Sequence, residues 1–184
     1  MSARPSNARR QLGVSLIEVL IALVVLSIGL IGIAGMQTTG LQSNYTSYQY
    51  TQAAMLAESL AERMRANTTG VQNSAYDLGA GSAPGSVSSD CGNETCSSAQ
   101  QAAWDLAGWY SALGQTAVQG APEGPRATLP AGGGSVVCAD DPCSDDSPRV
   151  ITVYWSANRD GASGYGCDAS NPADLQCFRM VFIP

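Results

Sequence analysis

The sequence contains no histidine and no lysine, and each absence removes a class of function. Without histidine the usual general base is missing, as are the Ser-His and Cys-His nucleophile pairs. Without lysine the chain has nine arginines against fifteen acidic residues and a formal net charge of −6. Binding to a phosphate backbone rests on basic contacts, so we expect no nucleic-acid partner. We also expect no enzyme activity, no catalytic residue, no cofactor and no small-molecule substrate, with carboxylate catalysis open in principle.

Charge is also missing from residues 19–36, which are almost all Val, Leu, Ile, Ala and Gly. A helix needs about 20 such residues to cross the roughly 30 Å core of a bilayer, so this run predicts a membrane-spanning helix. Arg4, Arg9 and Arg10 precede it, without any acidic residue. The positive-inside bias then predicts a cytoplasmic N-terminus, with the bulk of the chain on the opposite side of the membrane.

Proline is absent between Pro5 and Pro84, and glycine takes its place in the apolar run. Gly29, Gly32 and Gly35 are spaced by three and therefore lie along one side of the predicted helix. Small residues allow helices to approach closely, so this side is suited to packing against a neighbouring helix.

One carboxylate, Glu18, stands at the start of the apolar run. A carboxylate there costs about 2–3 kcal/mol unless it lies at the interface or finds a partner. Two ordinary interpretations leave it unexplained. One is a cleaved secretory signal, for which the sequence Gly-Ile-Ala at residues 32–34 resembles a cleavage site, and the other is a simple membrane anchor. The helix dipole favours a first-turn acid by about 0.3–1 kcal/mol, so part of the role of Glu18 can be intramolecular.

The residues around Glu18 resemble the class III signal of type IV pilins and type II secretion pseudopilins. The resemblance rests on Gly13, the apolar Val14 and the run Ser-Leu-Ile-Glu-Val-Leu-Ile-Ala-Leu at residues 15–23. It implies that a prepilin peptidase cuts between Gly13 and Val14, that Val14 is N-methylated, and that Glu18 meets the N-terminal amine of a neighbouring subunit during assembly. An opposite charge a few Å away offsets the desolvation of a carboxylate. Major pilins usually begin with Phe, so Val14 favours a minor subunit.

A helical pattern continues through residues 37–67, where side chains recur in steps of three and four. It predicts an amphipathic helix with one docking stripe, made of Leu41, Tyr45, Tyr48, Gln52, Met55, Leu56, Leu60 and Met64. The sequence Met-Arg-Ala-Asn at residues 64–67 closely resembles the end of this helix in minor pilins of the PilV type. We therefore divide the chain into a leader (1–13), a transmembrane half-helix (14–36), an amphipathic half-helix (37–67) and a globular head (68–184).

The head begins with a segment rich in Gly, Ser, Thr and Asn. Residues 68–90 are therefore expected to form a loop with at most one short extended piece. Ser97 and Gln100 form a capping-box pattern ahead of a short helix that Gly114 ends. Trp104 and Trp109 on that helix are typical of a core, although such rings also line ligand grooves.

Three β-branched and aromatic runs follow, at residues 134–138, 149–155 and 177–183. They predict a small antiparallel meander. One face of its last two strands is more apolar and is expected to pack on a helix, through Ile151, Val153, Trp155, Phe178, Met180 and Phe182. The predicted fold class is α+β and pilin-like, a long N-terminal membrane-spanning helix packed on a small antiparallel sheet stabilised by disulfides.

All six cysteines lie beyond the apolar run, at Cys91, Cys96, Cys138, Cys143, Cys167 and Cys177. An even number in an exported domain indicates disulfides, and the separations favour local pairs, although six cysteines allow fifteen connectivities. Zinc held by the two C-x₄-C pairs is a weaker alternative, because the spacing is at the edge of metal sites and histidine is absent. A calcium site at the acidic loop formed by Asp140, Asp141, Asp145 and Asp146 is also weaker than a solvated loop, so we expect no metal.

The resemblance implies a minor pilin that primes type IV pilus assembly and lies at or near the pilus tip, supporting twitching motility and adhesion. The implied partners are other minor pilins, the major pilin, the prepilin peptidase, a tip adhesin and the inner membrane. The implied location is a single pass of the inner membrane with a periplasmic head, then the extracellular pilus. A minor pseudopilin of type II secretion is the alternative within the family. A membrane-anchored periplasmic binding protein is the alternative of another class.

Overall fold

The computed structural model describes residues 13, 15–115, 118–122, 129–157, 161–168 and 170–184. Its elements, in chain order, are α1 (Leu16–Ala66), α2 (Thr68–Gln72), α3 (Ser98–Ala112), β1 (Gly133–Cys138), β2 (Arg149–Trp155) and β3 (Gln176–Phe182). The chain divides into two compact units, Met1–Asn44 and Tyr45–Pro184, and α1 contributes residues to both.

The first unit holds the apolar part of α1. Within the described residues, α1 is the one helix long and apolar enough to cross a membrane. Hydroxyl groups in the apolar run bond back to the helix, since Ser27 Oγ donates to the Leu23 carbonyl at 2.7 Å. This bond satisfies the hydroxyl without water, as an apolar environment requires.

The second unit contains the C-terminal part of α1, whose buried residues are mostly small. They are Gln49, Ala53, Ala57, Leu60, Ala61 and Met64. The predicted docking stripe is therefore only partly right. Leu60 and Met64 are buried, but Met55 is 61% exposed and Tyr48 is 48% exposed. The prediction gave weight to large side chains, whereas alanines form the close-packed surface on which the rest of the unit lies.

The structure corrects the prediction of a loop at residues 68–90, because the segment begins with the short helix α2. Asn67 follows α1 and caps α2, with its Oδ1 accepting the backbone N–H of Gly70 at 3.2 Å. A cap of this kind fixes a helical turn even where Thr and Gly are poor helix formers. The expected extended piece is present, since Leu78 and Val136 of β1 exchange two backbone bonds of 2.8 Å.

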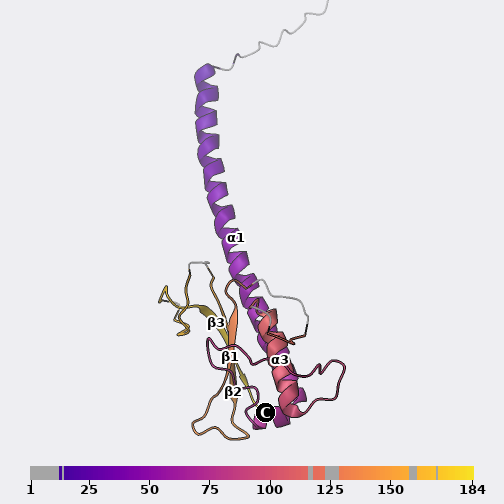
Figure 1. Ribbon diagram of the computed structural model, residues 1–184. Helices are drawn as coiled ribbons and strands as arrows, with labels where there is room; N and C mark the ends of the chain where they lie inside the picture. The colour runs from indigo at the N-terminus through magenta and orange to yellow at the C-terminus, as the bar shows by residue number, and fades with distance from the viewer. Residues whose placement is uncertain (1–12, 14, 116–117, 123–128, 158–160, 169) are drawn as a thin grey trace, which may run out of the picture. The chain divides into compact units, whose positions relative to one another are not determined.

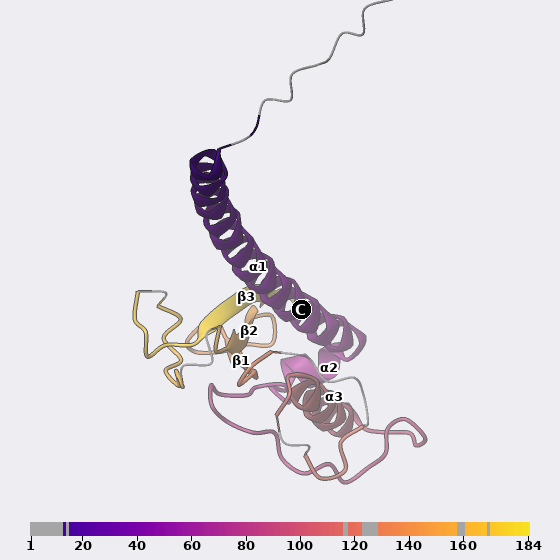
Figure 2. The same ribbon diagram turned by 90° about the horizontal axis from the view of Figure 1, so that it is seen from above.

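Helix α3 begins and ends as the sequence predicts. Ser97 and Gln100 form the capping box, and Gly114 follows the C-cap with a φ of +90°. Trp109 is buried, and its Nε1 donates to the Leu56 carbonyl of α1 at 2.9 Å. Trp104 is half-buried and lies outside the main core. Figure 1 shows α3 alongside the C-terminal part of α1, and Figure 2 shows α2 between the end of α1 and α3.

The three strands form an antiparallel sheet in the order β1-β2-β3, which confirms the predicted meander. The predicted apolar face is also confirmed, since Ile151, Val153 and Trp155 are fully buried and Phe182 is 2% exposed. Phe178 and Met180 are partly buried against the same core. A side chain at Gly134 would collide with the Trp109 ring, so this glycine lets α3 lie directly against β1. The fold is α+β, with a long N-terminal helix packed on a small sheet, as expected.

Candidate functional site

The N-terminal junction lies immediately before α1. Gly13 is exposed, while Val14, the residue expected to be methylated, falls outside the described residues. The Ser15 carbonyl accepts the backbone N–H groups of Glu18 at 3.0 Å and Val19 at 3.3 Å. The first helical turn is thus fixed two residues after the expected cleavage bond, and Glu18 lies in that turn.

Glu18 is a carboxylate at the border of an apolar surface. It is exposed and lines a shallow groove together with Val19, Ala22, Leu23 and Leu26. None of the ion pairs among the described residues includes Glu18. A carboxylate on an apolar helix that no cation of the described residues meets is suited to receive one from a neighbouring molecule.

A second groove follows the small residues of α1. It is lined by Gly32, Gly35, Met36, Thr39, Gly40 and Ser43. A Cβ atom added at Gly29, Gly32 or Gly35 would meet no heavy atom within 4 Å, so this side of the helix is open in the isolated chain. The predicted glycine side therefore exists as a surface that another helix can approach closely.

Three side chains link the helices of the head through a buried polar centre. Tyr76 donates from its hydroxyl to Asp105 Oδ2 at 2.7 Å, and Asn67 Nδ2 lies 3.2 Å from the Tyr76 hydroxyl. Asn67 Nδ2 also donates to the Ser98 carbonyl at 2.8 Å, which joins the end of α1 to the start of α3. Burial and the hydrogen bond to Asp105 raise the pKa of Tyr76 above that of an ordinary tyrosine. Asp105 is 5% exposed, and its Oδ1 also forms an ion pair with Nη1 of Arg63 in α1 at 3.5 Å.

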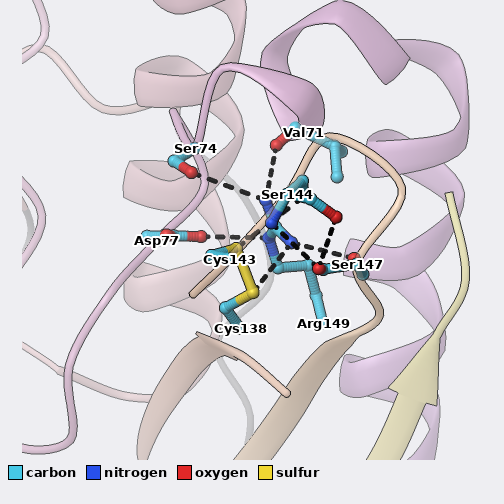
Figure 3. Close-up of polar contacts among 8 residues, drawn as sticks. All are labelled: Val71, Ser74, Asp77, Cys138, Cys143, Ser144, Ser147 and Arg149. Atoms are coloured by element: carbon cyan, nitrogen blue, oxygen red, sulfur yellow. Dashed lines mark hydrogen bonds and ion pairs between the residues drawn. A yellow bond between two sulfur atoms is a disulfide. The ribbon is translucent and has the colours of Figure 1, made fainter. Parts of the chain in front are cut away.

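Arg149 forms a second centre at the start of β2 (Figure 3). The residue is fully buried, and its guanidinium donates to the Val71 carbonyl at 3.0 Å and the Ser147 carbonyl at 2.8 Å. Its Nε lies 3.2 Å from Asp77 Oδ1, an ion pair outside hydrogen-bond alignment. Nη1 also lies 3.3 Å from Cys138 Sγ. One cation therefore joins β2, the segment after α2 and a disulfide loop. Its hydrogen bonds and its ion pair explain why a charge is tolerated in the core.

The structure pairs the cysteines locally, as their separations favour: Cys91 with Cys96, Cys138 with Cys143, and Cys167 with Cys177. The cysteines of both C-x₄-C pairs are thus consumed as disulfides. In the loop closed by the third bond, Ser170 donates its hydroxyl and its backbone N–H to Asp168 Oδ1, at 2.7 and 2.8 Å. These hydrogen bonds lower the pKa of the exposed Asp168 carboxyl.

Sequence reasoning missed both polar centres of the head. Arg149 had a readable signal, because it shares the alternation of Ile151, Val153 and Trp155 and so falls on the packed face of β2. A charged residue on a packed face needs a buried partner. Asn67, Tyr76 and Asp105 gave no such signal, since their contacts join segments far apart in the chain.

Two family models match the chain. The prokaryotic N-terminal methylation motif matches residues 8–34, which include Gly13, Val14 and Glu18. The model described as Tt1218-like, type IV pilin Tt1218, matches residues 35–107, which include most of α1, all of α2 and the first two thirds of α3. No curated protein and no solved structure matches the chain.

Proposed function

Because this chain belongs to the type IV pilin family, as a pilin or pseudopilin, we propose that it is a minor pilin of the PilV type that primes type IV pilus assembly. The observation that carries the proposal is the position of Glu18. It lies in the first turn of an apolar helix, five residues after Gly13, and no ion pair among the described residues neutralises it. An amine on a neighbouring subunit would supply the missing charge and fix the axial register of the two helices.

The processing steps follow from the same stretch. The prepilin peptidase cuts after Gly13, Val14 becomes the methylated first residue, and Glu18 becomes the fifth. Removal of Arg4, Arg9 and Arg10 with the leader changes the formal net charge of the chain from −6 to −9. Before assembly the helix crosses the inner membrane once, with the N-terminus in the cytoplasm and the head in the periplasm.

Two features favour a minor subunit over a major one. Val14 stands where major pilins usually carry Phe, and the end of α1 has the sequence Met-Arg-Ala-Asn at residues 64–67. The last residue of that segment, Asn67, caps α2 and bonds to α3, so the segment sets how the head is joined to the helix. A low-abundance subunit placed at or near the tip, beside other minor pilins and a tip adhesin, uses such a head for contacts with proteins.

The alternative within the family is a minor pseudopilin of type II secretion, and the alternative of another class is an anchored periplasmic binding protein. Deletion of the gene, followed by electron microscopy of surface fibres, twitching assays and assays of enzyme export, separates them. Loss of fibres and twitching, restored by the intact gene, is the expected result. Normal fibres with failed enzyme export would replace the proposal with the pseudopilin role. Normal fibres and normal export together would leave the binding protein.

A further inference from the structure

The face of the sheet opposite the core carries an uncovered row of apolar side chains. Val137, Val150 and Val181 are direct cross-strand partners in the register of β1, β2 and β3. Val137 is 41% exposed and Val181 is 62% exposed, and Ile183, two residues further along the chain, is 72% exposed. We call these four residues the apolar patch. Cross-strand partners on one face lie about 5 Å apart, so the patch is continuous.

On β2 the rest of this face is covered, whereas Arg179 of β3, opposite Thr152, is exposed. Thr152 and Tyr154 of β2 lie on the same face as Val150 but are only 3% and 4% exposed. The Tyr165 ring packs on Tyr154 with centroids 5.1 Å apart, and the Tyr154 hydroxyl lies 3.0 Å from Ser135 Oγ. The segment that carries Tyr165 therefore covers the Tyr154 end of this face, while the apolar patch and Arg179 stay open.

An acidic loop borders the open half. Residues 139–148 connect β1 to β2, one residue beyond Val137 and Val150, and they carry four exposed carboxylates, at Asp140, Asp141, Asp145 and Asp146. None of the ion pairs found in the described part of the chain includes them. The nearest arginine in sequence, Arg149, points into the opposite face and is fully buried.

The loop has a fixed shape (Figure 3). The disulfide between Cys138 and Cys143 closes its first half, and Ser144 donates its backbone N–H to Ser147 Oγ at 2.9 Å. The Ser147 carbonyl in turn accepts the Arg149 guanidinium at 2.8 Å. A preorganised loop loses little conformational freedom when it binds, so its four carboxylates present a ready-made anionic border.

The charge of this border selects the chemistry of the occupant. Anionic lipid and nucleic acid carry phosphates, which four uncompensated carboxylates repel. A second copy of the chain is poorly matched, because the sequence has no lysine. Its described arginines are also engaged: Arg63 pairs with Asp105, Arg65 with Glu62, and Arg149 with Asp77. The remaining described one, Arg179 of β3, is exposed on the same face, but one cation against four carboxylates in each copy leaves two such surfaces mutually repulsive.

We propose that the apolar patch and the acidic loop together dock a different protein, through a segment that carries apolar side chains beside lysine or arginine. The apolar side chains cover Val137, Val150 and Val181, and the basic groups reach the carboxylates of residues 140–146. The inference goes beyond the proposed function, because it holds equally for a pilin, a pseudopilin or an anchored protein.

Site-specific photo-crosslinking of the full chain in the cells that produce it tests this. The photoreactive amino acid p-benzoylphenylalanine replaces Val181, and in a matched control it replaces Gln72, which is exposed on α2. The expected product at position 181 joins this chain to a peptide of another protein in which Lys or Arg flanks apolar residues, as mass spectrometry of the crosslinked peptide would show. A product with another copy of this chain, with lipid alone, or none above the control would overturn the proposal.

The charge requirement is tested in the same cells. Replacing Asp140, Asp141, Asp145 and Asp146 together by Asn should lower the yield of the product at position 181 at least about fivefold. Replacing the exposed Glu58 and Glu94 by Gln should leave that yield unchanged. In membranes isolated from cells whose chain keeps all four aspartates, raising NaCl from about 0.05 M to about 0.5 M should also lower the yield of the product. This second measurement does not depend on whether the Asn variant folds. A yield that responds to neither change would show that charge does not select the partner.

Discussion

Arg149 Nε lies 3.2 Å from Asp77 Oδ1, and the arginine side chain is 1% exposed whereas that of the aspartate is 37% exposed. The pair is thus unequal, because the anion reaches water and the cation does not. Loss of the cation leaves the Val71 and Ser147 carbonyls without their donor. Loss of the anion leaves a buried charge that is hydrogen-bonded but not neutralised.

This inequality predicts a non-additive pair of substitutions. Arg149→Met should lower the free energy of unfolding by about 2–4 kcal/mol, because buried acceptors lose their donor. Asp77→Asn should lower it by about 2–3 kcal/mol, because the buried cation loses its counter-charge. The double variant should resemble Arg149→Met alone. Urea unfolding of the mature chain in detergent, with disulfides intact and tryptophan fluorescence as the signal, measures all three.

Asp146→Asn is the control for these measurements, since Asp146 is exposed and takes part in none of the ion pairs of the described chain. It should change the free energy of unfolding by no more than about 0.5 kcal/mol. Strictly additive losses in the double variant would show that Arg149 and Asp77 act independently.

Tyr76 predicts a loss of stability in alkali. Burial and the bond to Asp105 raise the pKa of Tyr76 in the folded chain above the ordinary value of 10.0. The folded chain therefore holds this proton more tightly than the unfolded chain does. The stability that the protonated Tyr76 contributes is complete below about pH 10 and declines as the pH rises above it. Urea unfolding between about pH 8 and pH 11 should show this decline, and in Tyr76→Phe the decline should be smaller. An equal slope in both proteins would contradict the assignment.

The three local disulfides should each stabilise the head by closing a short loop. Replacing both Cys138 and Cys143 by Ala should lower the free energy of unfolding by about 2–3 kcal/mol in the chain-entropy account. Peptide mapping without reduction should recover Cys91 with Cys96, Cys138 with Cys143, and Cys167 with Cys177 as separate linked peptides. A linked peptide that joins cysteines of two different pairs would refute this connectivity.

Cleavage of the leader should depend on Gly13. Gly13→Leu should leave an uncleaved, membrane-embedded precursor that still carries its thirteen leader residues. The reason is that the peptidase meets a bulky side chain beside the bond it cuts. Mass spectrometry of the N-terminal peptide checks this, and Gly29→Ala, a small change in the open helix surface, serves as a control that should mature normally. The same mature N-terminus in the Gly13 variant would exclude this cleavage site.

Glu18 should affect assembly and not maturation. Glu18→Ala and Glu18→Gln should both be cleaved and inserted, since the apolar run at residues 19–36 is unchanged. Both should enter filaments poorly, because the charge that pairs with a neighbouring amine is lost. Gln keeps the shape of the side chain and so isolates the charge. Quantitative blotting of sheared surface filaments against total membrane protein gives the measurement. Wild-type incorporation of both variants would mean that apolar packing alone drives assembly.

The elements that local sequence rules govern were predictable. Ser97 and Gln100 gave the start of α3, and the alternation around Val153 gave the packed face of the sheet, because caps and strand periodicity act over a few residues. The buried side of α1 was predicted less well, since alanines such as Ala57 carry little signal in a hydrophobic pattern. Asp105 was missed because Arg63 and Tyr76 lie tens of residues away, where chain-order patterns carry no information. The alternation of β2 places Arg149 on the packed face, but its partners Val71 and Asp77 are equally distant in sequence and could not be predicted.

The backbone pairing of Leu78 with β1 affects how two heads can associate. β1 and β3 are the two edges of the sheet, and the backbone pair between Leu78 and Val136 occupies the middle of β1. In the described part of the head, β3 is therefore the edge along which a foreign strand can extend. Because Leu78 already holds the backbone groups of Val136, a strand added to β1 would have to displace it, so pairing of two heads through β3 is favoured over open-ended strand addition at both edges.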